Sequence, residues 1–127
     1  MDETTVARWL ERYVEAWSSY DPDEIGDLFA EDAVYRYHPW DEGADVVRGR
    51  GDIVASWLGD RDRPGSWTAS YRPWLVADDR AVAVGVSRYL AEDGESVERE
   101  YHNVFLLTFD GEERCSEFTE HFLRRSD

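Results

Sequence analysis

The residues best suited to acid–base chemistry lie in the stretch DLFAEDAVYRYHPW, residues 27–40. It places Tyr35, Tyr37 and His38 directly before a proline. Histidine titrates near neutral pH, with an unperturbed pKa of about 6.5, so His38 is a candidate general acid or base. A histidine at the end of a strand can also make a purely structural hydrogen bond, and the sequence leaves both interpretations open.

Three further polar side chains are candidates for the same site. Tyr13 and Asn103, the only side-chain amide in the sequence, could donate hydrogen bonds to a developing oxyanion. Asn103 could instead bond to the backbone of a neighbouring strand. His121 is a second candidate acid or base, with a surface or dimer-contact role as the alternative. We expect Tyr13, His38, Asn103 and His121 to form the catalytic set.

A ligand-binding wall is expected around these groups. Arg88 can hold a carboxylate by a bidentate fork, either in a substrate or in Glu117. Aromatic residues at helical and strand spacing would line a hydrophobic cavity, although the same spacing is typical of an ordinary core. The expected lining residues besides Arg88 are Trp17, Tyr35, Trp40, Trp57 and Tyr101.

No metal or cofactor is predicted. His38, His102 and His121 are far apart in the sequence and do not form an HxxxH or HxH motif. Cys115 is alone, which excludes an internal disulfide and a thiolate zinc cluster. The RGRG stretch at residues 48–51 lacks the glycine spacing of a phosphate-binding loop.

Three helices are expected in the first half of the chain. Apolar residues recur at helical spacing over residues 4–19, from Val6 to Trp17. Asp21 and Pro22 are typical of the start of a second helix, which should run through Phe29. Asp52 is the expected cap of a third helix that ends at Gly59.

Strands dominate the remainder. A short strand over residues 33–38 and its partner over 46–48 precede four long strands over 67–76, 80–90, 97–109 and 114–124. Two of the three turns between the long strands contain an Asp-Gly pair. This order predicts an α+β fold in which a curved, cone-like antiparallel or mixed sheet carries the three helices on its concave face. The open end of such a cone could hold a ligand.

Composition defines the class of protein. The 127 residues, 42% of them hydrophobic, predict a single globular domain over residues 1–127. A net charge of −15 makes nucleic acid and membrane surfaces poor partners. The basic residues are all arginine, which excludes lysine Schiff-base chemistry. The N-terminus lacks the pattern of a secretory signal, so we expect a cytoplasmic protein.

The sequence resembles the nuclear-transport-factor-two-like superfamily, and in particular its SnoaL-like branch. Four stretches carry the resemblance: RYVEAW (12–17), DPDEIGDLFAEDAVY (21–35), RGRGDIVASW (48–57) and FDGEERCSEF (109–118). The resemblance implies a cone-like α+β barrel, frequent homodimers packed through the sheet, and a pocket used by isomerases, cyclases, dehydratases, hydrolases and non-catalytic binders. Fold alone therefore does not identify the reaction.

Ketosteroid isomerase, an enzyme whose catalytic groups have shifted pKa values, offers a more specific comparison of site residues. Tyr13 matches its oxyanion-hole tyrosine. The position of its base falls on Tyr37 or His38, and the position of its second oxyanion group falls near Asn103, where this sequence has no acid. The resemblance therefore implies a related pocket with a different set of catalytic groups.

Three functions remain open at this stage. The first is a cofactor-independent enzyme that acts on a small, hydrophobic, oxygenated molecule by general acid–base chemistry, with a homodimer formed through the sheet. The second is a non-catalytic ligand-binding or dimerisation module. The third is a protein-partner adaptor, which would need an exposed apolar patch.

Overall fold

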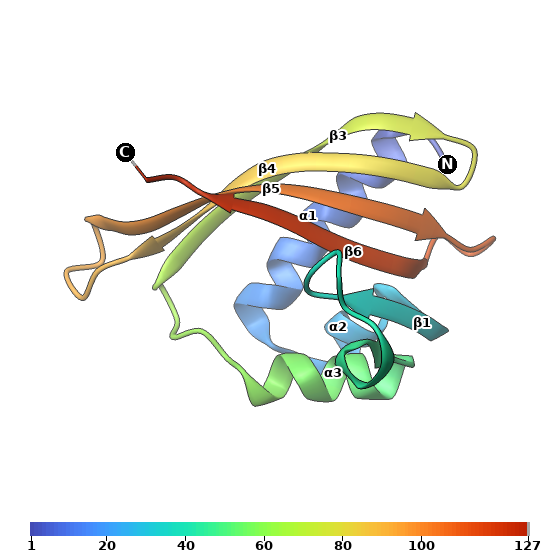
Figure 1. Ribbon diagram of the computed structural model, residues 1–127, viewed down its shortest axis with the longest axis horizontal. Coiled ribbons are helices and arrows are strands. Elements are labelled where there is room, and N and C mark those ends of the chain that lie inside the picture. Colours follow the sequence, from blue (N-terminus) through green and yellow to red (C-terminus); the bar gives the residue numbers. More distant parts are fainter. Residues whose placement is uncertain (127) are drawn as a thin grey trace.

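The computed structural model describes residues 1–126 and has three α-helices covering one face of a curved six-stranded sheet (Figure 1). The sheet order is β2-β1-β6-β5-β4-β3, with β1 parallel to β6 and all other neighbours antiparallel. The sheet is mixed and does not close into a barrel. The expected α+β architecture, with its helices on the concave face, is confirmed. The helices are α1 (Glu3–Ser19), α2 (Pro22–Gly26) and α3 (Arg50–Gly59), and the strands are β1 (Phe29–Arg36), β2 (Val47–Arg48), β3 (Trp67–Ala77), β4 (Arg80–Leu90), β5 (Val97–Phe109) and β6 (Cys115–Arg124).

Helix α1 is held in place by its caps and by one apolar face. The Asp2 carboxylate accepts a hydrogen bond from the Thr5 amide at the N-terminus, and Tyr20 ends the helix in the left-handed conformation. The buried face carries Trp9 and Tyr13 toward the sheet. Trp9 also donates its indole N–H to the Leu28 carbonyl at 3.0 Å, which ties α1 to the chain that leads into β1.

The second and third helices differ from the expectation at their ends. Helix α2 stops at Gly26 rather than at Phe29, because Phe29 already pairs with Cys115 in the sheet. Helix α3 begins at Arg50 rather than after an Asp52 cap. Gly49 precedes it with φ +90°, a conformation that L side chains rarely adopt, and this turn lets the helix start three residues earlier than expected.

Close packing between β3 and β4 depends on Gly85. A Cβ atom there would lie 2.2 Å from the Ser70 carbonyl oxygen and 2.7 Å from the Tyr71 Cα. Ala81, Ala83 and Ser87 share the inward face of β4 with it, and all three are small and buried. These residues leave room for α1 and for the Tyr71 ring between the helix and the sheet.

The core is built largely from aromatic rings. Phe118 of β6 lies at its centre and stacks on Tyr13 and on Tyr35, with ring centroids 5.6 and 4.4 Å apart. Phe105 and Trp9 pack around this stack. Within residues 1–126, no helix is long and apolar enough to cross a membrane.

Candidate functional site

A pocket of about 300 Å³ lies between the inward face of the sheet, α1 and α3. Its wall is mainly aromatic, and tyrosine supplies most of the rings. The aromatic lining residues are Trp17, Tyr20, Tyr35, Tyr37, Trp57, Tyr71, Tyr89, Tyr101 and Phe122, together with Tyr13 at the base. A pocket of this size and composition suits a small molecule with an apolar body.

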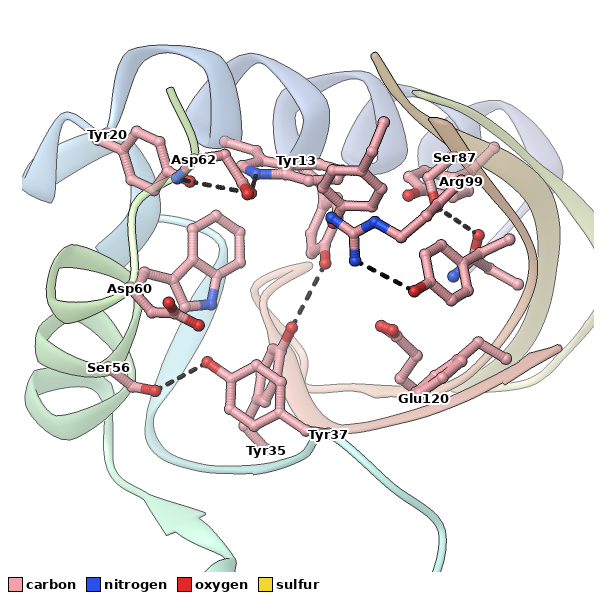
Figure 2. A pocket seen from close by; sticks show the side chains of 17 residues that line it. Tyr13, Tyr20, Tyr35, Tyr37, Ser56, Asp60, Asp62, Ser87, Arg99 and Glu120 are labelled. Atoms are coloured by element: carbon pink, nitrogen blue, oxygen red, sulfur yellow. Dashed lines mark hydrogen bonds between the residues drawn. The ribbon is translucent and has the colours of Figure 1, made fainter. Parts of the chain in front are cut away.

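Glu120 is the carboxylate that the sheet places inside this aromatic wall. Strand β6 alternates, so Phe118, Glu120 and Phe122 share the inward face, and the carboxylate points into the same space as the Tyr35 and Tyr37 hydroxyls (Figure 2). The side chain is partly buried and makes no hydrogen bond to another described residue. Loss of water around it raises the pKa of Glu120 from its ordinary 4.5 to about 7.

Two buried phenols form a neutral hydrogen-bonding pair beside Glu120. The Tyr13 and Tyr35 hydroxyl oxygens lie 3.3 Å apart. Burial raises the pKa of each well above its ordinary value, so both stay protonated. The pair has two hydroxyl hydrogens and one of them bridges the two oxygens. The other hydrogen remains available to a ligand oxygen.

A second polar group reaches the pocket from β4 and β5. Ser87 donates its hydroxyl to the Asn103 carbonyl oxygen at 2.8 Å, and both side chains are buried. The Asn103 amide nitrogen therefore stays free to donate to a ligand. Neighbouring Tyr71 is also kept protonated, because burial raises its pKa. On the α3 side, the hydroxyls of Tyr37 and Ser56 lie 2.8 Å apart.

The mouth of the pocket carries most of its charge. The Asp62 Oδ2 accepts hydrogen bonds from the Trp17 indole at 2.9 Å and from the Tyr20 hydroxyl at 3.5 Å. Asp60 lines the same side (Figure 2). Opposite them, the Arg99 guanidinium lies 4.5 Å from the Tyr89 ring centre. It is the one cationic side chain among the described lining residues.

Comparison with known proteins identifies the family. The model of the SnoaL-like domain matches residues 10–122, which is most of the chain. The chain belongs to the SnoaL-like family. A search among curated proteins finds no significant match. The family assignment rests on the match of the domain model to residues 10–122.

Solved structures share the fold of this SnoaL-like domain at low identity. A Kribbella flavida protein provisionally assigned as a ketosteroid isomerase is 17% identical, with a TM-score of 0.70 over 99% of this chain and 83% of that one. An NTF2-like protein of unknown function from Burkholderia xenovorans is 16% identical, with a TM-score of 0.71 over 98% and 88%. A Sinorhizobium meliloti protein provisionally assigned as a polyketide cyclase is 20% identical, with a TM-score of 0.63 over 95% and 100%. At these identities the comparison shows the fold.

The structure brings together six of the residues expected to form the site of this SnoaL-like protein. They come from α1, β1, α3 and β5 and all line the aromatic pocket. These residues are Tyr13, Trp17, Tyr35, Trp57, Tyr101 and Asn103. Their catalytic and ligand-binding roles stay predictions.

The other four expected site residues lie elsewhere. His38, Trp40, Arg88 and His121 line a second hollow of about 940 Å³, and Arg88 and His121 reach it from the outward face of the sheet. The His38 ring stacks on Trp40, and its Nδ1 lies 3.3 Å from Asp41.

Ion pairs hold Arg88, Glu100 and Glu117 on this outward face. Arg88 pairs with Glu100 at 2.7 Å, whereas Glu117, its expected partner, pairs with Arg36. His102, Arg88 and Arg125 together lower the pKa of Glu100 to about 2. Within residues 1–126, no group of three histidine, cysteine or carboxylate side chains is arranged to hold a metal ion.

Sequence reasoning missed Glu120 and the charged mouth. Glu120 lies two residues after the buried Phe118, so strand alternation from Phe118 would have found it. Asp60 and Asp62 belong to the loop between α3 and β3, where no periodic pattern indicates direction. The place of Asp62 at the pocket follows from its hydrogen bonds to Trp17 of α1 and to Tyr20, which lie more than 40 residues away in the sequence.

Proposed function

We propose that this SnoaL-like protein is a cofactor-independent enzyme that moves a proton on a small, hydrophobic, oxygenated molecule. The observation that carries the proposal is the Glu120 carboxyl group, which lies among the tyrosines of the aromatic pocket, where burial raises its pKa to about 7. A group with a pKa near the working pH can both accept and return a proton efficiently. His38 lies in the other hollow, so the acid–base role in this proposal belongs to Glu120.

The proposed step is proton abstraction next to a carbonyl group. Ionised Glu120 takes a proton from the carbon, the C–H bond breaks, and its electron pair moves into the carbonyl to give an enolate. The free hydroxyl hydrogen of the Tyr13–Tyr35 pair and the Asn103 amide donate hydrogen bonds to the enolate oxygen. In a β,γ-unsaturated ketone, protonated Glu120 then returns its proton to the γ-carbon of the conjugated enolate, which completes an isomerisation. In a β-hydroxy ketone it gives the proton to the β-hydroxyl, which leaves as water as the C=C bond forms and completes a dehydration.

The test uses a ketone whose carbon acidity is measurable without knowledge of the natural substrate. Incorporation of solvent deuterium next to the carbonyl of 2-tetralone is followed by NMR, with buffer alone as the reference. We expect the wild-type protein to accelerate exchange and Glu120→Gln to lose about a hundredfold or more of that rate. The control is Glu117→Gln, which removes a carboxylate from the outward face of the same strand.

Non-catalytic binding is the alternative function. It predicts a different result, because a binding module would bind 2-tetralone without accelerating deuterium exchange next to its carbonyl. Equal exchange rates for the wild-type protein and Glu120→Gln would favour that alternative and contradict the proposed enzyme.

We also propose that two copies of the chain associate through the outward face of the sheet. Apolar side chains follow this face across neighbouring strands; Leu106 and Leu123 are exposed, and the valines are partly buried. They include Val84, Val86, Val104, Leu106 and Leu123. Leu123 is 78% exposed, and burial of such residues between two copies would stabilise a dimer.

A further inference from the structure

The side chains that line the aromatic pocket carry more negative than positive charge. Three carboxylates, Asp60, Asp62 and Glu120, line it against the single guanidinium of Arg99. With Glu120 ionised, these four groups carry a net charge of −2, and with Glu120 protonated they carry −1. The whole chain adds a net charge of −15, so the surrounding field also favours a positive ligand.

The Arg99 guanidinium contacts aromatic side chains and is not paired with these carboxylates. Arg99 Cζ lies 4.5 Å from the Tyr89 ring centre, and its Nη1 donates to the Tyr101 hydroxyl at 3.3 Å. No ion pair joins Arg99 to Glu120, Asp60 or Asp62 in the described part of the chain. Arg61 lies over the Tyr20 ring at 5.5 Å and does not line the pocket. The Asp60 and Asp62 carboxylates at the mouth therefore remain available to a positively charged ligand.

Asp62 is positioned by neutral donors. The Trp17 indole and the Tyr20 hydroxyl both donate to its Oδ2, and the Asp62 amide donates back to the Tyr20 hydroxyl oxygen at 2.8 Å. These bonds fix the carboxylate without neutralising it. Its Oδ1 accepts no hydrogen bond from another residue in the range 1–126. An oriented carboxylate with a free oxygen beside aromatic rings suits a cationic group.

We propose that the pocket selects a substrate that carries a positively charged amine in addition to its oxygenated apolar body. The ammonium group lies at the mouth beside Asp60 and Asp62, across the pocket from Glu120, and its carbon atoms contact the faces of the surrounding rings (Figure 2). The oxygen lies at the Tyr13–Tyr35 pair and Asn103. This inference rests on the proposed function, since it names the substrate class of the same pocket.

The recognition should also depend on pH. The titratable and charged groups that line the pocket with Glu120 are tyrosines from α1, β1, β3, β4 and β5, Arg99 from β5, and Asp60 and Asp62 from the mouth. Tyr13, Tyr35, Tyr71 and Tyr89 stay neutral because burial raises the pKa of each. Affinity for the ammonium should therefore increase between about pH 6 and pH 8 as Glu120 ionises.

The experiment compares three 4-substituted phenols of similar shape that differ in charge. (4-Hydroxybenzyl)trimethylammonium is the cation, 4-neopentylphenol is its neutral carbon isostere, and 4-hydroxyphenylacetate is the anion. Binding is followed at low salt by the NMR shifts of the Trp17 and Trp57 indole N–H groups, because both residues line the pocket. We expect the cation to bind about tenfold tighter than the neutral isostere, and the anion to bind weakest.

Variants separate the site from general electrostatic attraction. Asp60→Asn and Asp62→Asn should each weaken binding of the cation about threefold or more and leave the neutral isostere unchanged. Asp32→Asn is the matched control, because Asp32 is exposed on β1 and does not line the pocket. Glu120→Gln should remove the increase in cation affinity between about pH 6 and pH 8.

Several results would overturn this inference. They are equal or tighter binding of the neutral isostere, tighter binding of the anion, no saturable binding of the cation, or full cation affinity in Asp60→Asn and Asp62→Asn. None of these results changes the expected incorporation of solvent deuterium into 2-tetralone, which tests the proposed function separately. Conversely, cation selectivity in a protein that fails to accelerate exchange would support this site and contradict the proposed enzyme.

Discussion

Glu120→Gln should change how the stability of the protein depends on pH. In the folded protein the carboxyl keeps its proton up to about pH 7, whereas in the unfolded chain it ionises near its ordinary value of 4.5. Between these values the folded state binds more protons than the unfolded state. The free energy of unfolding therefore falls as pH rises through this window.

The size of the effect follows from the same pKa. A rise from 4.5 to about 7 disfavours the ionised form in the folded state by about 3 kcal/mol, at about 1.4 kcal/mol per pKa unit. Glutamine carries no charge and loses this contribution. Relative to the wild-type protein, Glu120→Gln should therefore gain about 3 kcal/mol of stability between about pH 4.5 and pH 8.

Urea denaturation at fixed ionic strength measures this difference across the window. Glu117→Gln is the control, because this exposed carboxylate pairs with Arg36 on the outward face, and such surface pairs contribute at most about 1 kcal/mol. It should follow the pH dependence of the wild-type protein. The reasoning is refuted if the stability difference between Glu120→Gln and the wild-type protein is the same at both ends of the window.

Three further predictions test the packing, the hydrogen-bonding pair and the assembly. Gly85→Ala should lower the free energy of unfolding by about 1–3 kcal/mol, because its Cβ would lie 2.2 Å from a backbone oxygen. The control Gly51→Ala, in open space on α3, should raise the free energy of unfolding by about 0.5–1 kcal/mol. Equal effects of the two substitutions in urea denaturation would contradict this account. Tyr13→Phe should slow deuterium exchange into 2-tetralone about tenfold or more while the fold is kept, as checked by circular dichroism; an unchanged rate would remove the hydroxyl pair from the mechanism. Val86→Arg should give a monomer in light scattering at concentrations where the wild-type protein is a dimer, whereas a wild-type monomer or a dimeric variant would exclude this face as the contact.

Much of the fold could be predicted because its signals are local. The strands Arg80–Leu90 and Val97–Phe109 have the bounds expected from alternation and turn residues. The second helix is shorter than expected because pairing of Phe29 with Cys115, 86 positions apart in the sequence, overrides local helix preference.

The site was harder to predict, since it depends on long-range geometry. Alternation in a strand fixes which residues share a face, but the direction of that face depends on its partners. Tyr35 of β1 and Tyr37, just after this strand, line the aromatic pocket, whereas His38 lines the outward hollow. In β6 the same rule places Glu120 inward and His121 outward, so the glutamate lies where the histidine was expected.

The central claim is that Glu120 is poised to exchange a proton at neutral pH. An NMR titration of the Glu120 carboxyl carbon in the folded protein tests it most directly. We expect a midpoint at about pH 7, since the aromatic pocket withdraws water from the carboxylate. A midpoint near the ordinary value of 4.5 would contradict the account.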